Sequence, residues 1–301
     1  MIQSPFEPGP PRLRRPRFRP IPVRTLVPNL ITLLALCAGL TGVRLAIEGR
    51  LEWALAAIVF AAMLDGIDGR VARMLKGTSR FGAELDSLAD FFNFGVAPAL
   101  ILYFWGLHDL GSGGWIAAMV FAICASLRLA RFNVMIDDPN QPAWAGNFFT
   151  GVPAPAGAIV VLLPIYVSFL GLPRSSFVTW FSLFYTLAIG FLMVSRLPVL
   201  SGKKAGQRVP PDMVVPIFVV VVLFFALLIS YPWQVLTIGT LAYIICLPLG
   251  IISYRRFQQA DLALARANAS GAPTEASAAA ADPAAPPSSD APAKDDQPTR
   301  H

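Results

Sequence analysis

Long apolar segments constrain this chain more than any other feature of its sequence. A helix needs about 20 mostly apolar residues to cross the hydrocarbon core of a bilayer. The chain is 55% hydrophobic and only 14% charged, as is typical of a polytopic membrane protein rather than a soluble domain. We therefore predict an all-α transmembrane bundle of about eight spans, at residues 26–47, 52–75, 83–106, 114–134, 153–172, 175–197, 211–231 and 233–253.

Basic residues occur in every second link between these segments. The N-terminal residues are rich in Arg, and the link after the second segment holds Arg70, Arg73, Lys76 and Arg80, whereas residues 107–113 contain no Lys or Arg. Basic links face the cytoplasm. We therefore expect both termini on the cytoplasmic side of a bacterial inner membrane. The alternation also explains the net charge of +6 without a nucleic-acid partner.

Composition divides the chain into three parts. Residues 1–25 form a Pro- and Arg-rich arm, 26–257 the transmembrane domain, and 258–301 a tail rich in Ala and Pro that we expect to be disordered. The three cysteines lie scattered in apolar segments and predict neither a disulfide framework nor a metal site. With only two histidines in the chain, catalysis by a histidine base is not expected.

Four carboxylates gather where the second and third segments meet. Asp65 and Asp68 are three residues apart and Asp86 and Asp90 are four apart, so on helices each pair shares one face. The polar residues 74–81 between the pairs predict the turn of a helical hairpin that brings all four together near one membrane surface.

Carboxylates in such a place require a counter-charge. An all-carboxylate site suits Mg²⁺ or Mn²⁺, and four acids suffice for two ions of the kind that act on phosphoryl groups. Two alternatives are acids solvated at helix ends and a pathway for ions or protons.

The same stretch resembles the signature of the CDP-alcohol phosphatidyltransferase family, D-x-x-D-G-x-x-A-R, eight residues, then G-x-x-x-D-x-x-x-D. Every fixed position is present: Asp65, Asp68, Gly69, Ala72, Arg73, Gly82, Asp86 and Asp90. The resemblance implies that the four Asp residues bind two divalent cations and that Asp90 is also the general base. It further implies that the CDP part of a CDP-diacylglycerol donor is bound by Asn29, Thr32, Gly69, Arg73, Ser79 and Gly82.

Simpler roles remain open for some of these donor residues. For Arg73 the alternative to donor binding is an anchor at the membrane interface. Asn29 and Thr32 share one face of the first segment, where helix capping and hydrogen bonding between helices are alternatives to donor binding.

Two further stretches, 128–133 and 148–155, together with 86–90 and 195–198, resemble the integral-membrane bacterial phosphatidylserine synthases. That resemblance implies transfer from CDP-diacylglycerol to L-serine with release of CMP, in a homodimer. Arg128 and Arg131 share a helical face, and with Asn133 they are predicted to bind serine, Arg131 foremost; membrane anchoring is the alternative. Other functions left open are another acceptor (choline, glycerol 3-phosphate or an inositol phosphate) and a cation carrier.

Overall fold

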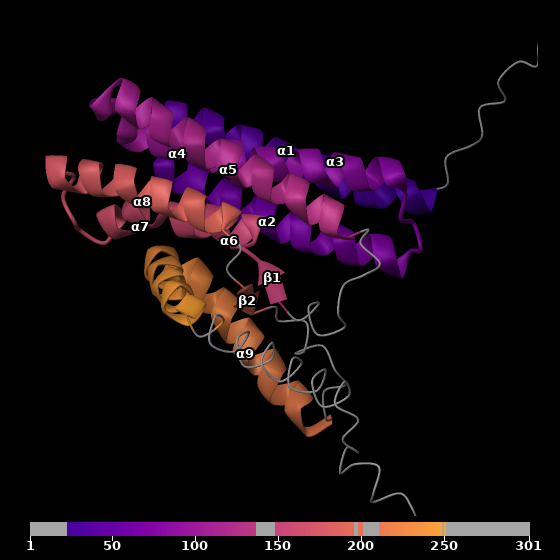
Figure 1. Cartoon of the computed structure of the whole chain (residues 1–301). Helices are drawn as coiled ribbons and strands as arrows, with labels where there is room; N and C mark the ends of the chain where they lie inside the picture. The colour runs from indigo at the N-terminus through magenta and orange to yellow at the C-terminus, as the bar shows by residue number, and fades with distance from the viewer. Residues whose placement is uncertain (1–22, 137–147, 196–197, 201–210, 249, 251–301) are drawn as a thin grey trace, which may run out of the picture. The chain divides into compact units, whose positions relative to one another are not determined.

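The computed structural model describes residues 23–136, 148–195, 198–200, 211–248 and 250. Nearly all of them are helical (Figure 1). The elements in chain order are α1 (Val23–Ile47), α2 (Leu51–Met74), α3 (Arg80–Phe91), the π-helical η1 (Phe92–Val96), α4 (Ala97–Trp105), the 3-10 helix η2 (Leu107–Leu110), α5 (Ser112–Ile136), β1 (Phe148–Thr150), α6 (Ala154–Val161), α7 (Leu163–Phe169), α8 (Ser176–Val194), β2 (Pro198–Leu200), α9 (Pro211–Ser230) and a last described helix, Pro232–Pro248.

Helical segments occupy all eight predicted positions, so the all-α bundle is confirmed. Five helices within the described ranges are long and apolar enough to cross a membrane: Arg24–Ile47, Arg80–Trp105, Ser112–Met135, Ser176–Val194 and Met213–Ser230. The helices Ala154–Phe169 and Pro232–Pro248 are apolar but shorter. α2 carries several charged residues, including Asp65 and Asp68. The count of eight crossings therefore stays a prediction.

Helix α1 begins earlier than the predicted span. The first span was predicted from residue 26, but the helix starts at Val23 and includes Pro28. Asn29 is consequently not a capping residue, and residues 23–25 of the predicted arm are helical. The rest of the arm and the predicted tail, 258–301, lie outside the described residues.

The predicted hairpin forms from α2 and α3, and helix α1 packs against both of its arms. α2 ends at Met74 and α3 begins after Ser79, whose hydroxyl accepts a hydrogen bond from the Gly82 amide at 3.0 Å. α1 packs along α2 and also against α3. A Cβ on Gly77, in the turn, would lie 2.1 Å from the Arg24 carbonyl oxygen, so only glycine allows the turn to approach α1 this closely.

The third predicted segment contains a π-helical turn directly after Asp90. η1 joins α3 to α4, and its Asn93 is 1% exposed. The Asn93 side chain packs against Gly39 of α1, where an added Cβ would lie 2.1 Å from Asn93 Oδ1. Such single-turn insertions in helices are frequent at functional sites. This one changes the helical register immediately after the last acid of the motif.

The hydrophobic core is formed mainly by α2, η1, α4, η2, α5, α6, α7 and α8 and includes the fully buried side chains of Phe94, Phe121 and Tyr166. α5 and α8 pack closely, with Gly190 of α8 beside the backbone of Phe121. At the end of α4, Arg174 donates a hydrogen bond to the Trp105 carbonyl at 2.6 Å and pairs with Asp109. This contact joins η2 to the link before α8.

Two very short strands are the only β-structure among the described residues. β1 pairs antiparallel with β2, with Phe149 opposite Val199. The pairing brings the segment before α6 beside the segment after α8. Both belong to stretches singled out in the sequence.

Candidate functional site

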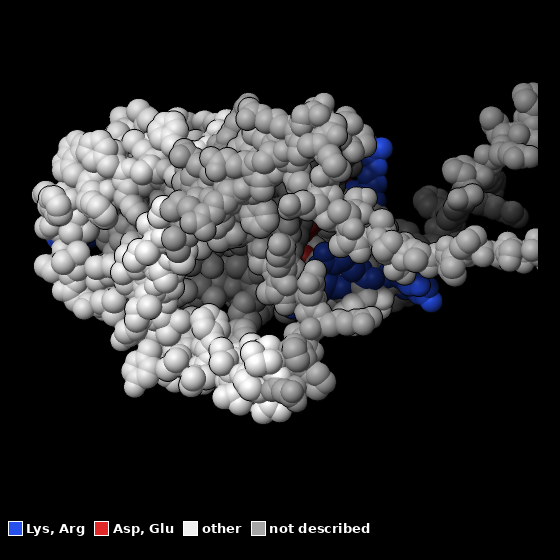
Figure 2. Space-filling view, turned by 60° about the horizontal axis from the view of Figure 1, so that its bottom comes forward, with Lys and Arg blue, Asp and Glu red and all other residues white. Residues whose placement is uncertain are grey.

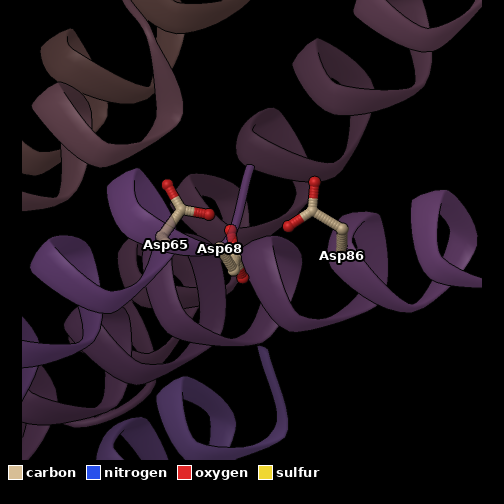
Figure 3. Close-up of side chains that lie close together, drawn as sticks. All are labelled: Asp65, Asp68 and Asp86. Atoms are coloured by element: carbon tan, nitrogen blue, oxygen red, sulfur yellow. The ribbon is translucent and has the colours of Figure 1, made fainter. Parts of the chain in front are cut away.

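Three of the predicted acids converge between α2 and α3. One carboxylate oxygen from each of Asp65, Asp68 and Asp86 lies within 4.8 Å of the others (Figure 3). Figure 3 shows Asp65 and Asp68 on one helix and Asp86 facing them from the next. Asp68 is 4% exposed and the other two are partly buried. The spacing argument therefore predicted this convergence correctly.

The fourth acid, Asp90, lies beside this group of three but is not one of the acids whose oxygens lie within 4.8 Å of one another. It lies within electrostatic range of Asp65, Asp68 and Asp86. Carboxylates this close cannot all carry their charge without a proton or a cation between them. A hard divalent cation with an all-oxygen preference fits this set of donor atoms, so the residues present suit the predicted metal site.

Helix α1 fixes one of the acids in place. The Thr32 hydroxyl donates a hydrogen bond to Asp68 Oδ2 at 2.7 Å and lies 3.1 Å from the Pro28 carbonyl oxygen. Both Thr32 and Asp68 are buried. Thr32 thus makes the hydrogen bond between helices that the sequence left open as an alternative. It also contributes to the cleft beside Asp68.

A cleft of about 530 Å³ opens beside these acids. Its walls come from α1, α2, the turn and α3, and it is lined by Pro28, Asn29, Thr32, Asp68, Gly69, Ala72, Arg73, Gly77, Thr78, Ser79, Gly82, Ala83 and Asp86. All six predicted donor-binding residues belong to this one lining. Four lining residues were not predicted, although each lies within three residues of a predicted one: Pro28, Gly77, Thr78 and Ala83.

The surface of this end of the bundle is basic. Figure 2 shows Lys and Arg side chains gathered at one end, with acidic atoms visible in a recess beside them. Arg73 lines the cleft itself, and in the described part of the chain no carboxylate lies within ion-pair distance of it. A phosphate-bearing ligand would find cations at the rim and carboxylates deeper in.

Two glycines of the motif serve different needs. A Cβ on Gly82 would lie 2.7 Å from Asn29 Oδ1, so this glycine allows α3 to pack against α1. A Cβ on Gly69 would meet nothing within 4 Å, although Gly69 lines the cleft. Packing within the chain therefore does not require glycine at position 69. The open space in front of its backbone is space that a ligand can use.

The three predicted serine-binding residues separate into different settings. Arg128 is 7% exposed, lies within electrostatic range of Asp90, and stacks over the Phe132 ring at 5.5 Å from its centroid. Arg131, the foremost candidate, instead donates a hydrogen bond to the Val194 carbonyl at 2.6 Å. Of the two arginines, Arg128 is the one directed toward the acids.

Asn133 connects α5 to the helix that carries two of the acids. Its side-chain amide donates to the Ser87 hydroxyl at 2.9 Å, and Ser87 follows Asp86. Arg131 connects α5 to the end of α8 through the Val194 carbonyl. Gly151 also lies against the end of α8, since a Cβ on Gly151 (φ +78°) would lie 2.4 Å from the Met193 carbonyl oxygen. The stretches 86–90, 128–133, 148–155 and the end of α8 thus meet at one end of the bundle, although they are far apart in sequence.

Sequence comparison identifies the family. The model of the CDP-alcohol phosphatidyltransferase family matches residues 25–192, more than half of the chain, and includes every helix of the acid cluster and the cleft. This chain belongs to the CDP-alcohol phosphatidyltransferase family. A second model, CDP-alcohol phosphatidyltransferase 2, matches residues 212–248. As a member of this family, the chain is an integral-membrane transferase.

Curated relatives of this phosphatidyltransferase carry specific names. A protein of Mycobacterium leprae named CDP-diacylglycerol–serine O-phosphatidyltransferase is 40% identical over 243 residues, which cover 80% of this chain and 79% of that protein. One of Helicobacter pylori with the same name is 33% identical over 75% of this chain and 91% of that protein. An archaetidylserine synthase of Methanothermobacter thermautotrophicus is 30% identical over 60% of this chain and 72% of that protein.

Proposed function

We propose that this phosphatidyltransferase is a phosphatidylserine synthase, which transfers the phosphatidyl group of CDP-diacylglycerol to L-serine and releases CMP. The observation that carries the proposal is the cleft, in which a cluster of acids adjoins an arginine, a bare glycine backbone and a polar turn. The names of the relatives, CDP-diacylglycerol–serine O-phosphatidyltransferase, support serine as the acceptor. The separate family match supports the donor half of the reaction.

Asp65, Asp68, Asp86 and Asp90 would hold two divalent cations, Mg²⁺ or Mn²⁺. When bound, such ions neutralise the donor pyrophosphate and stabilise the leaving phosphate of CMP. The cytidine diphosphate would lie in the cleft between α1, α2 and α3. There Arg73 would pair with the pyrophosphate, Gly69 would let it approach the α2 backbone, and Asn29, Thr32, Ser79 and Gly82 would form the rest of the contact surface.

Asp90 is proposed as the general base. It would accept the proton of the serine hydroxyl while that oxygen attacks the lipid-side phosphorus. A new oxygen–phosphorus bond forms as the bond from that phosphorus to the CMP oxygen breaks. The Asp90 carboxyl lies within electrostatic range of both Asp65 and Arg128, so it could act on an acceptor held by Arg128.

Arg128 is the proposed partner of the serine carboxylate, because its guanidinium is buried near Asp90. Arg131 and Asn133 are proposed to support this side indirectly, through Val194 and Ser87. This changes the order of the candidates: Arg131, first by its place in the sequence, has a backbone partner of its own. Serine binding by any of the three stays a prediction.

The membrane setting follows the basic links. We propose that the acid cluster and both termini face the cytoplasm across a bacterial inner membrane, and that the enzyme is a homodimer. The proposed division into an arm (1–25), a catalytic domain (26–257) and a tail (258–301) is consistent with the matched ranges, which lie within 25–248. The acyl chains of the donor can then stay in the leaflet while serine arrives from water.

A screen of acceptors tests the function. The purified full-length chain would be supplied with CDP-diacylglycerol, Mg²⁺ or Mn²⁺ and one acceptor at a time, and CMP release would be measured. Serine should exceed choline, glycerol 3-phosphate and inositol phosphate by at least about tenfold, equivalent to about 1.4 kcal/mol. Faster release with another acceptor refutes the serine assignment. No release with any acceptor would favour a cation carrier, and full turnover in excess EDTA would refute the metal site.

A further inference from the structure

The buried guanidinium of Arg128 has an incomplete set of partners. Its Nε atom is inaccessible to solvent and has no hydrogen-bond partner within the described ranges, where no carboxylate lies within ion-pair distance of it either. One face of the group is covered by Phe132. Burying a charge without a partner is unfavourable. An anion bound from outside the chain would supply the missing partner.

A second unpartnered group faces Arg128 from the last described helix. The Tyr243 hydroxyl is inaccessible to solvent, has no hydrogen-bond partner in the described part of the chain, and lies within electrostatic range of Arg128. Thr240, one turn earlier on the same face and 2% exposed, also has an unpartnered hydroxyl. Buried hydroxyls normally find a partner, so both mark a place where a polar ligand is missing.

Other polar residues of the same types in this bundle do have hydrogen-bond partners. Thr237, on the same helix, donates to the Trp233 carbonyl at 2.7 Å, and Tyr185 of α8 donates to the Val160 carbonyl at 2.8 Å. The bundle therefore satisfies polar groups of the same types where they serve packing alone. Tyr243 and Arg128 are left unsatisfied, and Arg128 lies within electrostatic range of both Asp90 and Tyr243.

We propose that the helix Pro232–Pro248 completes the acceptor site, with the Tyr243 hydroxyl and the Arg128 guanidinium binding one carboxylate of the acceptor amino acid. Tyr243 is thus a specificity-determining residue, and the inference rests on the proposed function. The hydroxyl donates one hydrogen bond to a carboxylate oxygen and the guanidinium supplies charge and further donors. An acceptor alcohol without a carboxylate, such as choline, leaves both groups unpaired, which disfavours its binding.

The test uses Tyr243→Phe, which removes one oxygen and keeps the ring, with Tyr231→Phe as the matched control. Tyr231 lies just before the same helix and is 57% exposed. CMP release by the purified full-length chain is measured over a range of L-serine and of CDP-diacylglycerol concentrations. Tyr243→Phe should raise the KM for serine about tenfold, the effect of one hydrogen bond to a charged group, and leave the KM for CDP-diacylglycerol unchanged. Tyr231→Phe should change neither.

A double variant separates direct binding from packing. With Arg128→Lys already present, Tyr243→Phe should raise the KM for serine by a smaller factor than it does alone, because both residues bind the same carboxylate. An unchanged KM for serine, an equal rise in both KM values, or full additivity of the two substitutions overturns the proposal. None of those results concerns serine-dependent CMP release by the unmodified chain, which tests the proposed function separately. Loss of that serine dependence would instead refute the proposed function.

Discussion

Replacing Thr32 by Val tests whether α1 orients the metal cluster. The substitution keeps the side-chain shape and removes the hydroxyl that donates to Asp68 at 2.7 Å. A hydrogen bond to a charged group contributes about 1.5–3 kcal/mol. Asp68 is only 4% exposed, so water cannot easily replace the lost donor. The carboxylate would then be less well oriented toward its neighbours Asp65 and Asp86.

The expected result is weaker metal activation. Outer partners of metal ligands typically contribute 10- to 100-fold in affinity, and this range, about 1.4–2.8 kcal/mol, agrees with the energy of the lost hydrogen bond. Thr32→Val should therefore shift the Mg²⁺ or Mn²⁺ concentration for half-maximal CMP release upward by about 10- to 100-fold. Much of the maximal rate should return at saturating metal, because all four carboxylates are still present.

Thr41→Val is the matched control. Thr41 lies on the same helix, nearer its C-terminal end. Among the described residues its hydroxyl donates only to the Cys37 carbonyl, at 2.7 Å, and not to any of the acids. Its metal titration should coincide with that of the unmodified chain. Identical titrations for Thr32→Val and Thr41→Val would refute the argument. So would a rate loss in Thr32→Val that no metal concentration restores, because that loss would not come from the orientation of Asp68.

Three further outcomes are expected. Gly69→Ala should lower activity by raising the KM for CDP-diacylglycerol, whereas Gly66→Ala on the same helix should leave that KM unchanged. Neither added Cβ would meet protein atoms within 4 Å, so both variants should be as thermally stable as the unmodified chain. Equal kinetics of the two variants would contradict a ligand at Gly69. Asp90→Asn should reduce the rate by at least about two orders of magnitude, the usual scale for a lost general base, while Asp109→Asn, at an exposed pair with Arg174, should be silent in the same assay. A Thr78→Cys variant in a cysteine-free background should be labelled from the cytoplasmic side, and labelling only from outside would overturn the proposed topology.

Local sequence rules predicted the acid cluster well, because its geometry is mostly local. A spacing of three on α2, a polar turn and a spacing of four on α3 suffice to bring Asp65, Asp68 and Asp86 together. The hydrogen bond from Thr32 was less accessible, since it depends on which face of α1 meets α2. The sequence offered this bond only as one alternative for a polar residue on an apolar helix.

Features that depend on distant partners were beyond the sequence. Arg128 and Arg131 share a helical face, yet one turns toward Asp90 and the other toward the Val194 carbonyl, 63 residues away. The π-helical turn at η1 carries no distinguishing residue pattern, so it was predicted as regular helix. Helix α1 passes through Pro28 because a proline near a helix start sacrifices few hydrogen bonds.

Helix α9 shows how strongly the surroundings decide the conformation of this chain. It contains four consecutive valines, 219–222, and its membrane-length window has no buried residue. In water, β-branched residues favour extended strands, and an uncharged run of this kind is prone to aggregate as cross-β structure. In hydrocarbon, a single segment can satisfy its backbone groups only as a helix. The lipid therefore determines the helical conformation of α9, and the same stretch exposed to water would favour pairing with another chain instead.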